Sequence, residues 1–127
     1  MKRRVLIFGA SGFVGAYLAS EFQQHGYVVY GSDVKLGSVS KKLAGFYTCD
    51  LLNSDEVKSI ISEVQPTEIV NLAAISNVGL CWKIPQKAIE VNVCGTLNIL
   101  EAAKCCNPMP KVLLIGSSEE YTITDEP

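Results

Sequence analysis

The sequence predicts an α/β fold in which helices cover both faces of a parallel, doubly wound sheet. Two observations support this prediction. Short apolar runs alternate along the chain with segments of helical periodicity, and the first run, residues 5–8, leads directly into a glycine-rich turn. Since parallel strands are joined by right-handed crossovers, the alternation favours the strand order 3-2-1-4-5. Ligands of such sheets bind beyond the carboxyl ends of the strands, where the order reverses between the first and fourth strands.

Three glycines with the spacing Gly-x-x-Gly-x-x-Gly follow the first apolar run, at Gly9, Gly12 and Gly15. Gly9 permits the turn out of the strand, and Gly12 removes a side chain that would block an anion. Gly15 lets the next helix lie close to the sheet, so that N–H groups at its start face the anion. This arrangement is typical of a Rossmann-like fold that binds the pyrophosphate of a dinucleotide. The alternative is a turn with a purely structural role.

The first helix and the second strand agree with a dinucleotide site. Apolar residues follow the glycines at helical spacing, and Gly26 provides a C-terminal stop. The residues that share this spacing are Val14, Tyr17, Leu18, Phe22 and the polar Glu21. The second strand, residues 27–32, ends at Asp33, about 20 residues past the glycines. An acid at that position is placed to accept hydrogen bonds from the ribose hydroxyls of the adenosine half.

The remaining segments continue the alternation. Residues 34–44 are polar and contain glycine, so we expect a loop with at most a short helix. Asn53 and Glu56 have the spacing of a capping box, and Pro66 ends the helix that follows. A longer helix is expected from near Pro85 to about Cys106. Further strands are expected over residues 46–49, 68–74 and 111–116.

Composition and charge exclude several classes of function. With 127 residues, 48% of them hydrophobic, the chain can bury one core. A formal net charge of −2 leaves neither a basic footprint for nucleic acid nor a polybasic patch for membranes. No apolar run reaches the length of a transmembrane helix, and Gly9 interrupts the first run too early for a secretory signal. We therefore expect no nucleic-acid or membrane partner and a cytoplasmic location.

The cysteines form no Cys-x-x-Cys pair and are odd in number. We expect small buried hydrophobic residues of a reducing compartment, and neither disulfides nor a metal site. These residues are Cys49, Cys81, Cys94, Cys105 and Cys106.

Four segments carry a resemblance to a known family. They read G-A-S-G-F-V-G at residues 9–15, N-L-A-A at 71–74, N-V-C-G-T-L-N at 92–98 and G-S-S-E-E-Y at 116–121. Together they resemble the extended short-chain dehydrogenase/reductases, the superfamily of NAD-dependent nucleotide-sugar epimerases and dehydratases. The last segment looks most like GDP-mannose 4,6-dehydratases and GDP-4-keto-6-deoxyhexose reductases. The resemblance spans the whole chain but only the amino-terminal part of such an enzyme.

The resemblance implies an NAD site around the glycine turn. In it Asp33 binds the adenosine ribose, Asp50 with Leu51 contacts adenine, and small residues line the nicotinamide-ribose side. The implied cofactor-binding residues are Gly9, Ser11, Gly12, Phe13, Val14, Gly15, Asp33, Asp50, Leu51, Leu72, Ala73, Ala74 and Ser76. Related enzymes often carry Thr-Ser-Arg where this chain has Ser32-Asp33-Val34. An acid there repels a 2′-phosphate, which favours NAD over NADP.

Ser117 and Glu119 are the catalytic residues that the resemblance implies. Ser117 matches the serine or threonine that hydrogen-bonds the sugar oxygen undergoing oxidation. Glu119 matches the dehydratase glutamate that removes a proton next to the new ketone. The alternatives are a turn at the end of the fifth strand for Ser117 and a solvated loop acid for Glu119. Asn92 matches the family's helix asparagine, whose alternative role is to satisfy local backbone groups.

The family's catalytic Tyr-x-x-x-Lys pair has no match in this chain, because none of its tyrosines has lysine four residues on. We expect residues 1–127 to form an incomplete NAD(P)-binding Rossmann domain, inactive alone, of an enzyme that acts on a nucleotide-sugar through a 4-keto intermediate. The uncovered fifth strand should favour homo-oligomers. The alternatives are a non-catalytic dinucleotide-binding module and a reductase of another small carbonyl substrate.

Overall fold

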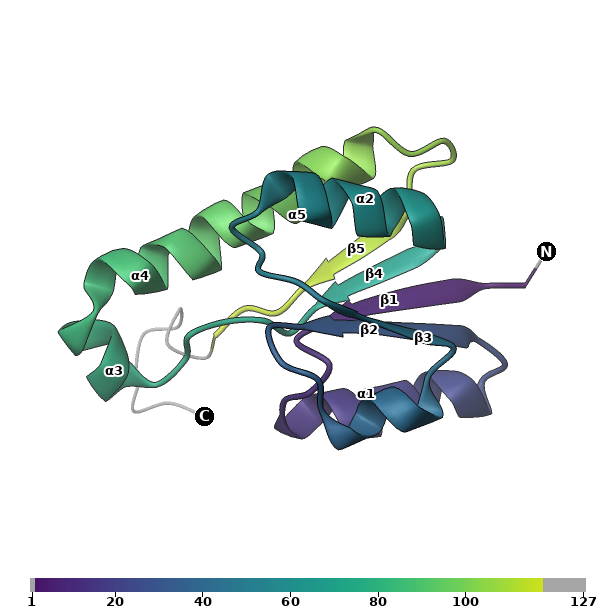
Figure 1. The fold of residues 1–127 in the computed structure, drawn as a ribbon, viewed down its shortest axis with the longest axis horizontal. Helices are drawn as coiled ribbons and strands as arrows, with labels where there is room; N and C mark the ends of the chain where they lie inside the picture. Colours follow the sequence, from purple (N-terminus) through teal and green to yellow (C-terminus); the bar gives the residue numbers. More distant parts are fainter. Residues whose placement is uncertain (1, 118–127) are drawn as a thin grey trace, which may run out of the picture.

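A computed structural model describes residues 2–117, which form a parallel sheet between two layers of helices (Figure 1). The strand order over these residues is β3-β2-β1-β4-β5, as the sequence predicts. The fold class and the strand order are therefore confirmed. The strands are β1 (Arg4–Phe8), β2 (Val28–Asp33), β3 (Gly45–Thr48), β4 (Glu68–Asn71) and β5 (Lys111–Leu114).

Helices lie on both faces of the sheet, with α1 on one face and α2 and α5 on the other (Figure 1). Their bounds are α1 (Phe13–Gln24), the 3-10 helix η1 (Ser38–Lys42), α2 (Ser54–Val64), α3 (Val78–Lys83), α4 (Pro85–Ile89), the π-helical turn η2 (Glu90–Gly95) and α5 (Thr96–Lys104). The short helix η1 lies within the segment expected to be a loop with at most a short helix. Within residues 2–117, no helix has the length and apolar character needed to span a membrane.

The central strand β1 holds the two cores together. Its residues Val5–Phe8 are almost completely buried, and successive side chains point to opposite faces. Val5 and Ile7 join the core under α1 and η1, and Leu6 and Phe8 join the core under α2 and α5. β1 pairs with β2 on one side and β4 on the other, so the chain leaves its carboxyl end at the point where the strand order reverses.

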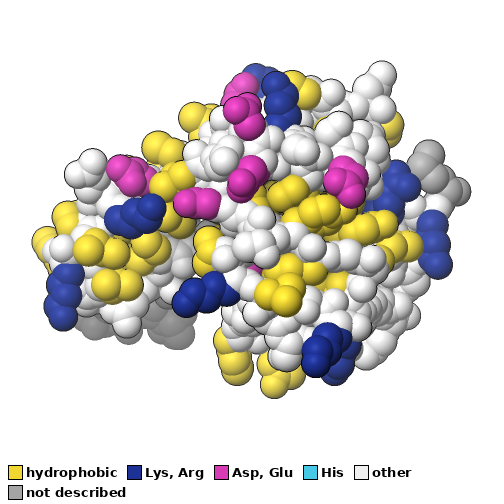
Figure 2. All heavy atoms as spheres, in the orientation of Figure 1, with side chains coloured by type: hydrophobic (Ala, Val, Ile, Leu, Met, Phe, Trp, Pro, Cys, Tyr) yellow, Lys and Arg dark blue, Asp and Glu magenta, His cyan; other side chains and the backbone are white. Residues whose placement is uncertain are grey.

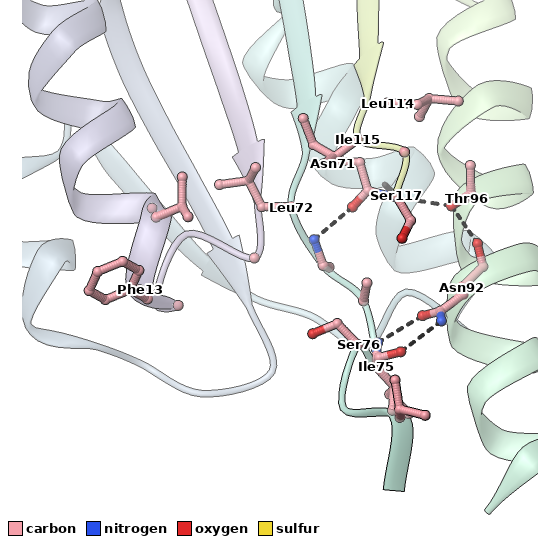
Figure 3. Close-up of a pocket in the computed structure, with 18 residues that line it drawn as sticks. Phe13, Asn71, Leu72, Ile75, Ser76, Asn92, Thr96, Leu114, Ile115 and Ser117 are labelled. Carbon is pink, nitrogen blue, oxygen red and sulfur yellow. Dashed lines mark hydrogen bonds between the residues drawn. The ribbon is translucent and has the colours of Figure 1, made fainter. Parts of the chain in front are cut away.

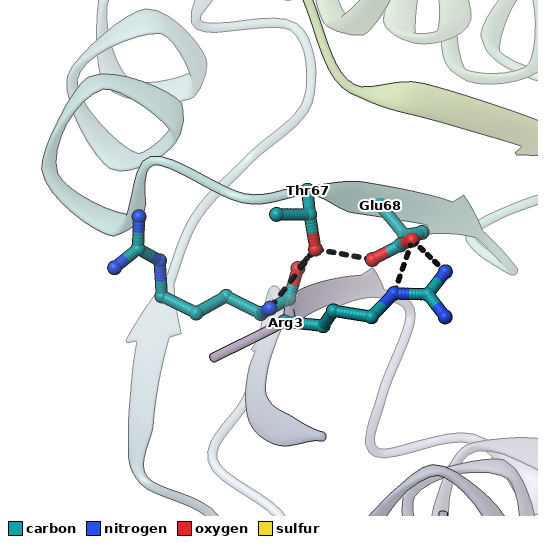
Figure 4. A network of polar contacts seen from close by, with 4 residues as sticks. Arg3, Thr67 and Glu68 are labelled. Atoms are coloured by element: carbon teal, nitrogen blue, oxygen red, sulfur yellow. Dashed lines mark hydrogen bonds and ion pairs between the residues drawn. The ribbon is translucent and has the colours of Figure 1, made fainter. Parts of the chain in front are cut away.

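Polar contacts join the amino ends of β1 and β4, at the end of the strands opposite the glycine turn (Figure 4). The Arg4 N–H donates to Thr67 Oγ1 at 2.9 Å, and the Thr67 hydroxyl lies 2.9 Å from the Arg4 carbonyl oxygen. Arg3 forms an ion pair with Glu68 and lies over the ring of Tyr27, 4.5 Å from its centroid. These contacts fix the register of β1 against β4, which stay paired up to Phe8 and Asn71 at their carboxyl ends.

The first helix, α1, buries only part of the apolar set that its spacing predicts. Leu18 and Phe22 pack against the core under the helix, whereas Val14 and Tyr17 are 52% and 70% exposed. Gly15 and Ala19 are buried as well, because the helix approaches the preceding turn closely at Gly15. Gly26, with φ of 81°, ends the helix region as expected.

The second half of the chain departs from the expected elements in three places. β4 ends at Asn71 and β5 at Leu114, so both strands are shorter than predicted. An unpredicted helix, α3, follows β4, and the Asn77 side chain caps it by accepting from the Leu80 N–H at 2.9 Å. The long helix expected from Pro85 is divided by the π-helical turn η2. At α2 the cap is as predicted, since Asn53 accepts from the Glu56 N–H at 3.2 Å.

The cysteines are all free, but the expectation that all are buried is wrong. Cys49 is buried beside the sheet, whereas Cys94 and Cys105 are exposed because they lie on the outer side of η2 and at the end of α5. Burial raises the pKa of the Cys49 thiol to about 11, so this group stays neutral near pH 7.

Candidate functional site

The glycine turn brings β1, β4 and α1 into close contact. Gly9 has a φ of 80°, and a Cβ there would lie 2.6 Å from the Ala73 nitrogen. A Cβ on Gly15 would lie 2.0 Å from the Ala10 carbonyl oxygen. At Gly12 the nearest atom is the Gly9 oxygen at 3.3 Å, and the residue lines an open cleft. Gly9 and Gly15 are thus needed by the fold itself, whereas the missing side chain of Gly12 leaves room in the cleft.

The N-terminus of α1 faces this cleft without a compensating charge. Gly12 is the N-cap residue and offers no side-chain cap, and the first turn of the helix contains no acidic residue. Phe13 and Val14 begin the helix and line the cleft together with Gly12. The partial positive charge of a helix N-terminus and its free N–H groups favour an anion in such a place.

The cleft has a volume of about 730 Å³ and lies at the carboxyl ends of β1, β4 and β5 (Figure 3). In Figure 3 Phe13 stands on one side of it, and Asn92 and Thr96 stand on the opposite side. Of the residues predicted for the site, it is lined by Gly9, Gly12, Phe13, Val14, Gly15, Leu72, Ala73, Ala74, Ser76 and Ser117. Asn71, Ile75, Val78, Leu114, Ile115 and Gly116 also line it and were not predicted as site residues.

Asp33 connects the glycine turn to the end of β2. Its Oδ2 accepts from the Ser11 N–H at 3.0 Å, and its Oδ1 accepts from the Val34 N–H at 2.7 Å. The Ser11 hydroxyl donates to the Lys35 carbonyl at 3.0 Å. Ser11 thus fixes the turn through its contacts with Asp33 and Lys35, and its part in cofactor binding stays a prediction.

A second, smaller cavity of about 60 Å³ adjoins the cleft, and Gly9 and Ala73 line both. Asp33, Asp50 and Leu51 line this smaller cavity, so the structure brings these three predicted residues together. The other lining residues are Phe8, Ser32, Val34, Cys49 and Val91. The two cavities together form one crevice across the reversal point of the sheet.

Leu51 is held in the wall of the smaller cavity by α5. The Asn98 side chain donates to the Leu51 carbonyl at 2.7 Å, and Leu51 is itself buried. Asp50 Oδ1 accepts from the Leu52 N–H at 3.0 Å, which fixes the turn that follows β3. This side of the crevice is therefore shaped by hydrogen bonds that involve the turn backbone.

A side-chain network fixes the backbone of the segment after β4, on the wall of the large cleft (Figure 3). Asn92 Oδ1 accepts from the Ile75 N–H at 2.8 Å, and its Nδ2 donates to the Ile75 carbonyl at 2.9 Å. Asn71 Oδ1 accepts from the Ala73 N–H at 3.0 Å, and Asn71 Nδ2 donates to Thr96 Oγ1 at 3.2 Å. Asn92 thus bonds the backbone of a segment 17 residues away, and not the local backbone groups of the alternative interpretation.

The predicted catalytic pair is described only in part. Ser117 lines the large cleft beyond the end of β5, and Glu119 lies outside the described residues. Asn71 and Thr96 were missed as site residues, although both stand inside the motifs that carried the resemblance. The sequence pattern that could have found Asn71 is a polar residue directly at the end of an apolar strand. For Thr96 it is a polar residue at the start of the helix that faces this strand end.

The chain belongs to the NAD dependent epimerase/dehydratase family, whose family model matches residues 5–127. It is 30% identical to Protein CapI of Staphylococcus aureus, over 93% of this chain and 39% of that protein. It is also 30% identical to a GDP-mannose 4,6-dehydratase of Vibrio cholerae, over 99% of this chain and 38% of the dehydratase. The chain thus spans about two fifths of the length of these relatives.

Solved structures of the same fold extend the comparison. A UDP-glucose 4-epimerase from Brucella ovis, in complex with NAD, has a TM-score of 0.84 and 26% identity over 95% of this chain and 38% of its own. A UDP-glucose-4-epimerase from Stenotrophomonas maltophila has a TM-score of 0.88 over 98% of this chain and 40% of its own, at 23% identity. At 23% identity, the similarity to the Stenotrophomonas maltophila structure shows the fold alone.

Proposed function

We propose that this chain is the NAD-binding part of a nucleotide-sugar epimerase, dehydratase or reductase that acts through a 4-keto sugar intermediate. The observation that carries the proposal is the crevice at the reversal point of the sheet, with an uncapped helix N-terminus at one wall and Asp33 at another. Membership of the family and its nucleotide-sugar relatives support the substrate class. In this proposal residues 1–127 form the cofactor domain.

The described residues fit an elongated dinucleotide. The pyrophosphate would lie at Gly12, where a Cβ would meet the Gly9 oxygen at 3.3 Å and narrow the cleft, against the first N–H groups of α1. Asp33 would accept from the adenosine ribose, and Asp50 with the Leu51 backbone would hold the adenine. Ala73, Ala74 and Ser76 would line the nicotinamide-ribose side of the large cleft. When bound, NAD supplies the hydride acceptor for oxidation of a sugar carbon.

NAD suits this site better than NADP. The Asp33 carboxylate accepts two backbone N–H bonds and lies at the place where the ribose hydroxyls would lie. A 2′-phosphate would bring a second anion to the same place, and two like charges at short range repel each other. A ribose hydroxyl can instead donate to the carboxylate.

Two residues would act on the sugar. Ser117 lines the cleft and would donate a hydrogen bond to the sugar oxygen at the carbon that is oxidised. Glu119 would remove a proton from the carbon next to the new ketone, because the carbonyl makes that C–H bond more acidic. The tyrosine and lysine of the family's Tyr-x-x-x-Lys pair would come from sequence outside these residues.

Self-association belongs to the same proposal. Within residues 2–117 β5 is an edge strand, and Leu113, Leu114 and Ile115 on and after it are 54%, 44% and 59% exposed. Further apolar side chains gather on the surface over α3 and α4 (Figure 2), among them Trp82, which is 82% exposed. Exposed apolar surface next to an open sheet edge favours contact with a second copy.

The complete protein that carries this sequence provides the test. Purified protein is titrated with NAD and NADP by calorimetry, and then incubated with a panel of nucleotide-sugars while product sugars are separated by mass spectrometry. Tight binding of NAD together with turnover of a nucleotide-sugar supports the proposal. NAD binding without any turnover, and without a Tyr-x-x-x-Lys pair further along the chain, would instead favour a non-catalytic dinucleotide-binding module.

A further inference from the structure

Ser32 carries a buried hydroxyl group that the fold does not use. The residue is 1% exposed, and its Oγ has no hydrogen-bond partner among residues 2–117. Its backbone carbonyl is well satisfied, since it accepts from the N–H groups of Gly9 and Ala10 at 2.8 and 3.1 Å. Buried polar side chains are almost always hydrogen-bonded, so an exception in a cavity wall indicates a partner that comes from outside the chain.

The surroundings of Ser32 give the fold no reason to prefer a hydroxyl group at this position. Ser32 pairs with Phe8 in the sheet, and both line the smaller cavity together with Leu51 and Cys49. The Cys49 thiol donates to the Asp50 carbonyl at 3.4 Å, so it is directed to another acceptor. An alanine would fill this buried position without placing an unpartnered polar atom there.

The cavity beside Ser32 has a buried apolar end and a polar rim. Phe8, Ser32 and Cys49 are buried, whereas Val34 and Asp50 at the rim are exposed. Asp33, next in the chain to Ser32, lines the same cavity. A ligand group that enters between the rim acids meets apolar walls and one hydroxyl. The cavity holds only about 60 Å³, so it would take the edge of a flat heteroaromatic ring that carries acceptor nitrogens, with the rest of the ring outside in the crevice.

We propose that the Ser32 hydroxyl binds the adenosine half of the cofactor by hydrogen-bonding a polar atom of the nucleobase that enters the smaller cavity. The inference rests on the proposed function, because it assumes that a dinucleotide occupies the crevice. Binding converts an unpartnered buried hydroxyl into a partnered one. Ser32 therefore contributes to ligand affinity while lowering the stability of the ligand-free protein.

The substitution Ser32→Ala in the complete protein separates these two effects. Calorimetry measures the dissociation constants of AMP and NAD, and thermal unfolding without ligand measures Tm. We expect both dissociation constants to rise by the same factor, about 3- to 10-fold for one lost hydrogen bond. The Tm of the ligand-free variant should equal or exceed that of the wild type. Ser20→Ala, on the exposed side of α1, is the control and should change neither quantity.

The near-isosteric Ser32→Cys provides a second variant, because a thiol is a weak donor that keeps the cavity filled. It should weaken AMP binding in the same direction. Unchanged AMP affinity in both variants, when the wild type binds AMP, overturns this inference alone. A fall of several degrees in the ligand-free Tm of Ser32→Ala also overturns it, because the hydroxyl would then stabilise the free protein. A wild type that binds neither NAD nor AMP overturns the proposed function and this inference with it.

Discussion

Replacing Gly12 by alanine tests whether the glycine turn binds a pyrophosphate, separately from its part in folding. The backbone at Gly12, with φ of −75° and ψ of 177°, is extended and suits an alanine. The added Cβ would lie 3.3 Å from the Gly9 oxygen, a contact that a shift of a few tenths of an ångström relieves. A lower unfolded-state entropy offsets part of that strain, so we expect the stability to change by less than about 1 kcal/mol.

The same substitution should have a large effect on binding. A methyl group at Gly12 occupies the place where phosphate oxygens would approach the first N–H groups of α1. Loss of one charge-assisted hydrogen bond costs about 1.5–3 kcal/mol, which corresponds to at least a tenfold rise in the dissociation constant of NAD. Calorimetric titration of the complete protein with NAD measures this directly.

Gly15→Ala is the matched comparison within the same turn. Its Cβ would lie 2.0 Å from the Ala10 carbonyl oxygen, so α1 must move away from the turn by more than an ångström. We expect a loss of about 3 kcal/mol or more of stability in urea unfolding. Wild-type affinity for NAD in Gly12→Ala would refute the placement of the pyrophosphate. Unchanged stability in Gly15→Ala would refute the close contact of helix and turn.

Three further substitutions or measurements probe other parts of the crevice. Asp33→Ala should raise the dissociation constant of NAD about tenfold or more and should reduce the ratio between the affinities for NAD and NADP. Equal affinity of the wild type for both cofactors would contradict the role of Asp33. Asn92→Ala removes both hydrogen bonds to Ile75 and should lower stability by about 2 kcal/mol and weaken NAD binding, whereas Asn92→Asp, which keeps the acceptor for the Ile75 N–H, should lose less. Cys49 should resist iodoacetamide in the native protein at pH 8 and react in urea, as mass spectrometry would show, because the buried thiol has its pKa raised to about 11. Since the unfolded thiol ionises first, this residue also makes stability fall as the pH rises from 9 towards 11.

The sequence predicted the parts of the molecule that depend on local chemistry. The Asn53 cap and the close approaches of Gly12 to Gly9 and of Gly15 to Ala10 each involve neighbours close in the chain, and the structure has the cap and the turn where these residues indicate. The apolar spacing of α1 predicted only part of its inner face. Leu18 and Phe22 pack against the core, whereas the close approach of the helix to the turn at Gly15 leaves Val14 exposed, and apolar periodicity carries no information on such an approach.

Two contacts of the site that were missed join distant segments. Asn71 meets Thr96 across 25 residues of sequence, and Asn92 meets Ile75 across 17. Each pairing depends on how η2 and α5 are rotated about the helix axis relative to β4. The π-helical turn η2 changes this rotation, and a periodic pattern of apolar residues does not predict such a turn. The unpartnered hydroxyl of Ser32 was missed for a related reason, since its sequence position reads as an ordinary strand residue.

The π-helical turn η2 amounts to one additional residue inserted into an otherwise regular helix. Each residue rotates an α-helix by about 100°, so deleting one residue from Glu90–Gly95 would turn Asn92 away from Ile75 while α5 kept its contacts. The helix would gain regular backbone hydrogen bonds, but it would lose the hydrogen bonds between Asn92 and Ile75 at the cleft wall. A shortened chain of this kind would bind the ligand more weakly, and length variation at this turn is therefore a means of tuning the cleft by reorienting Asn92 and not by replacing it.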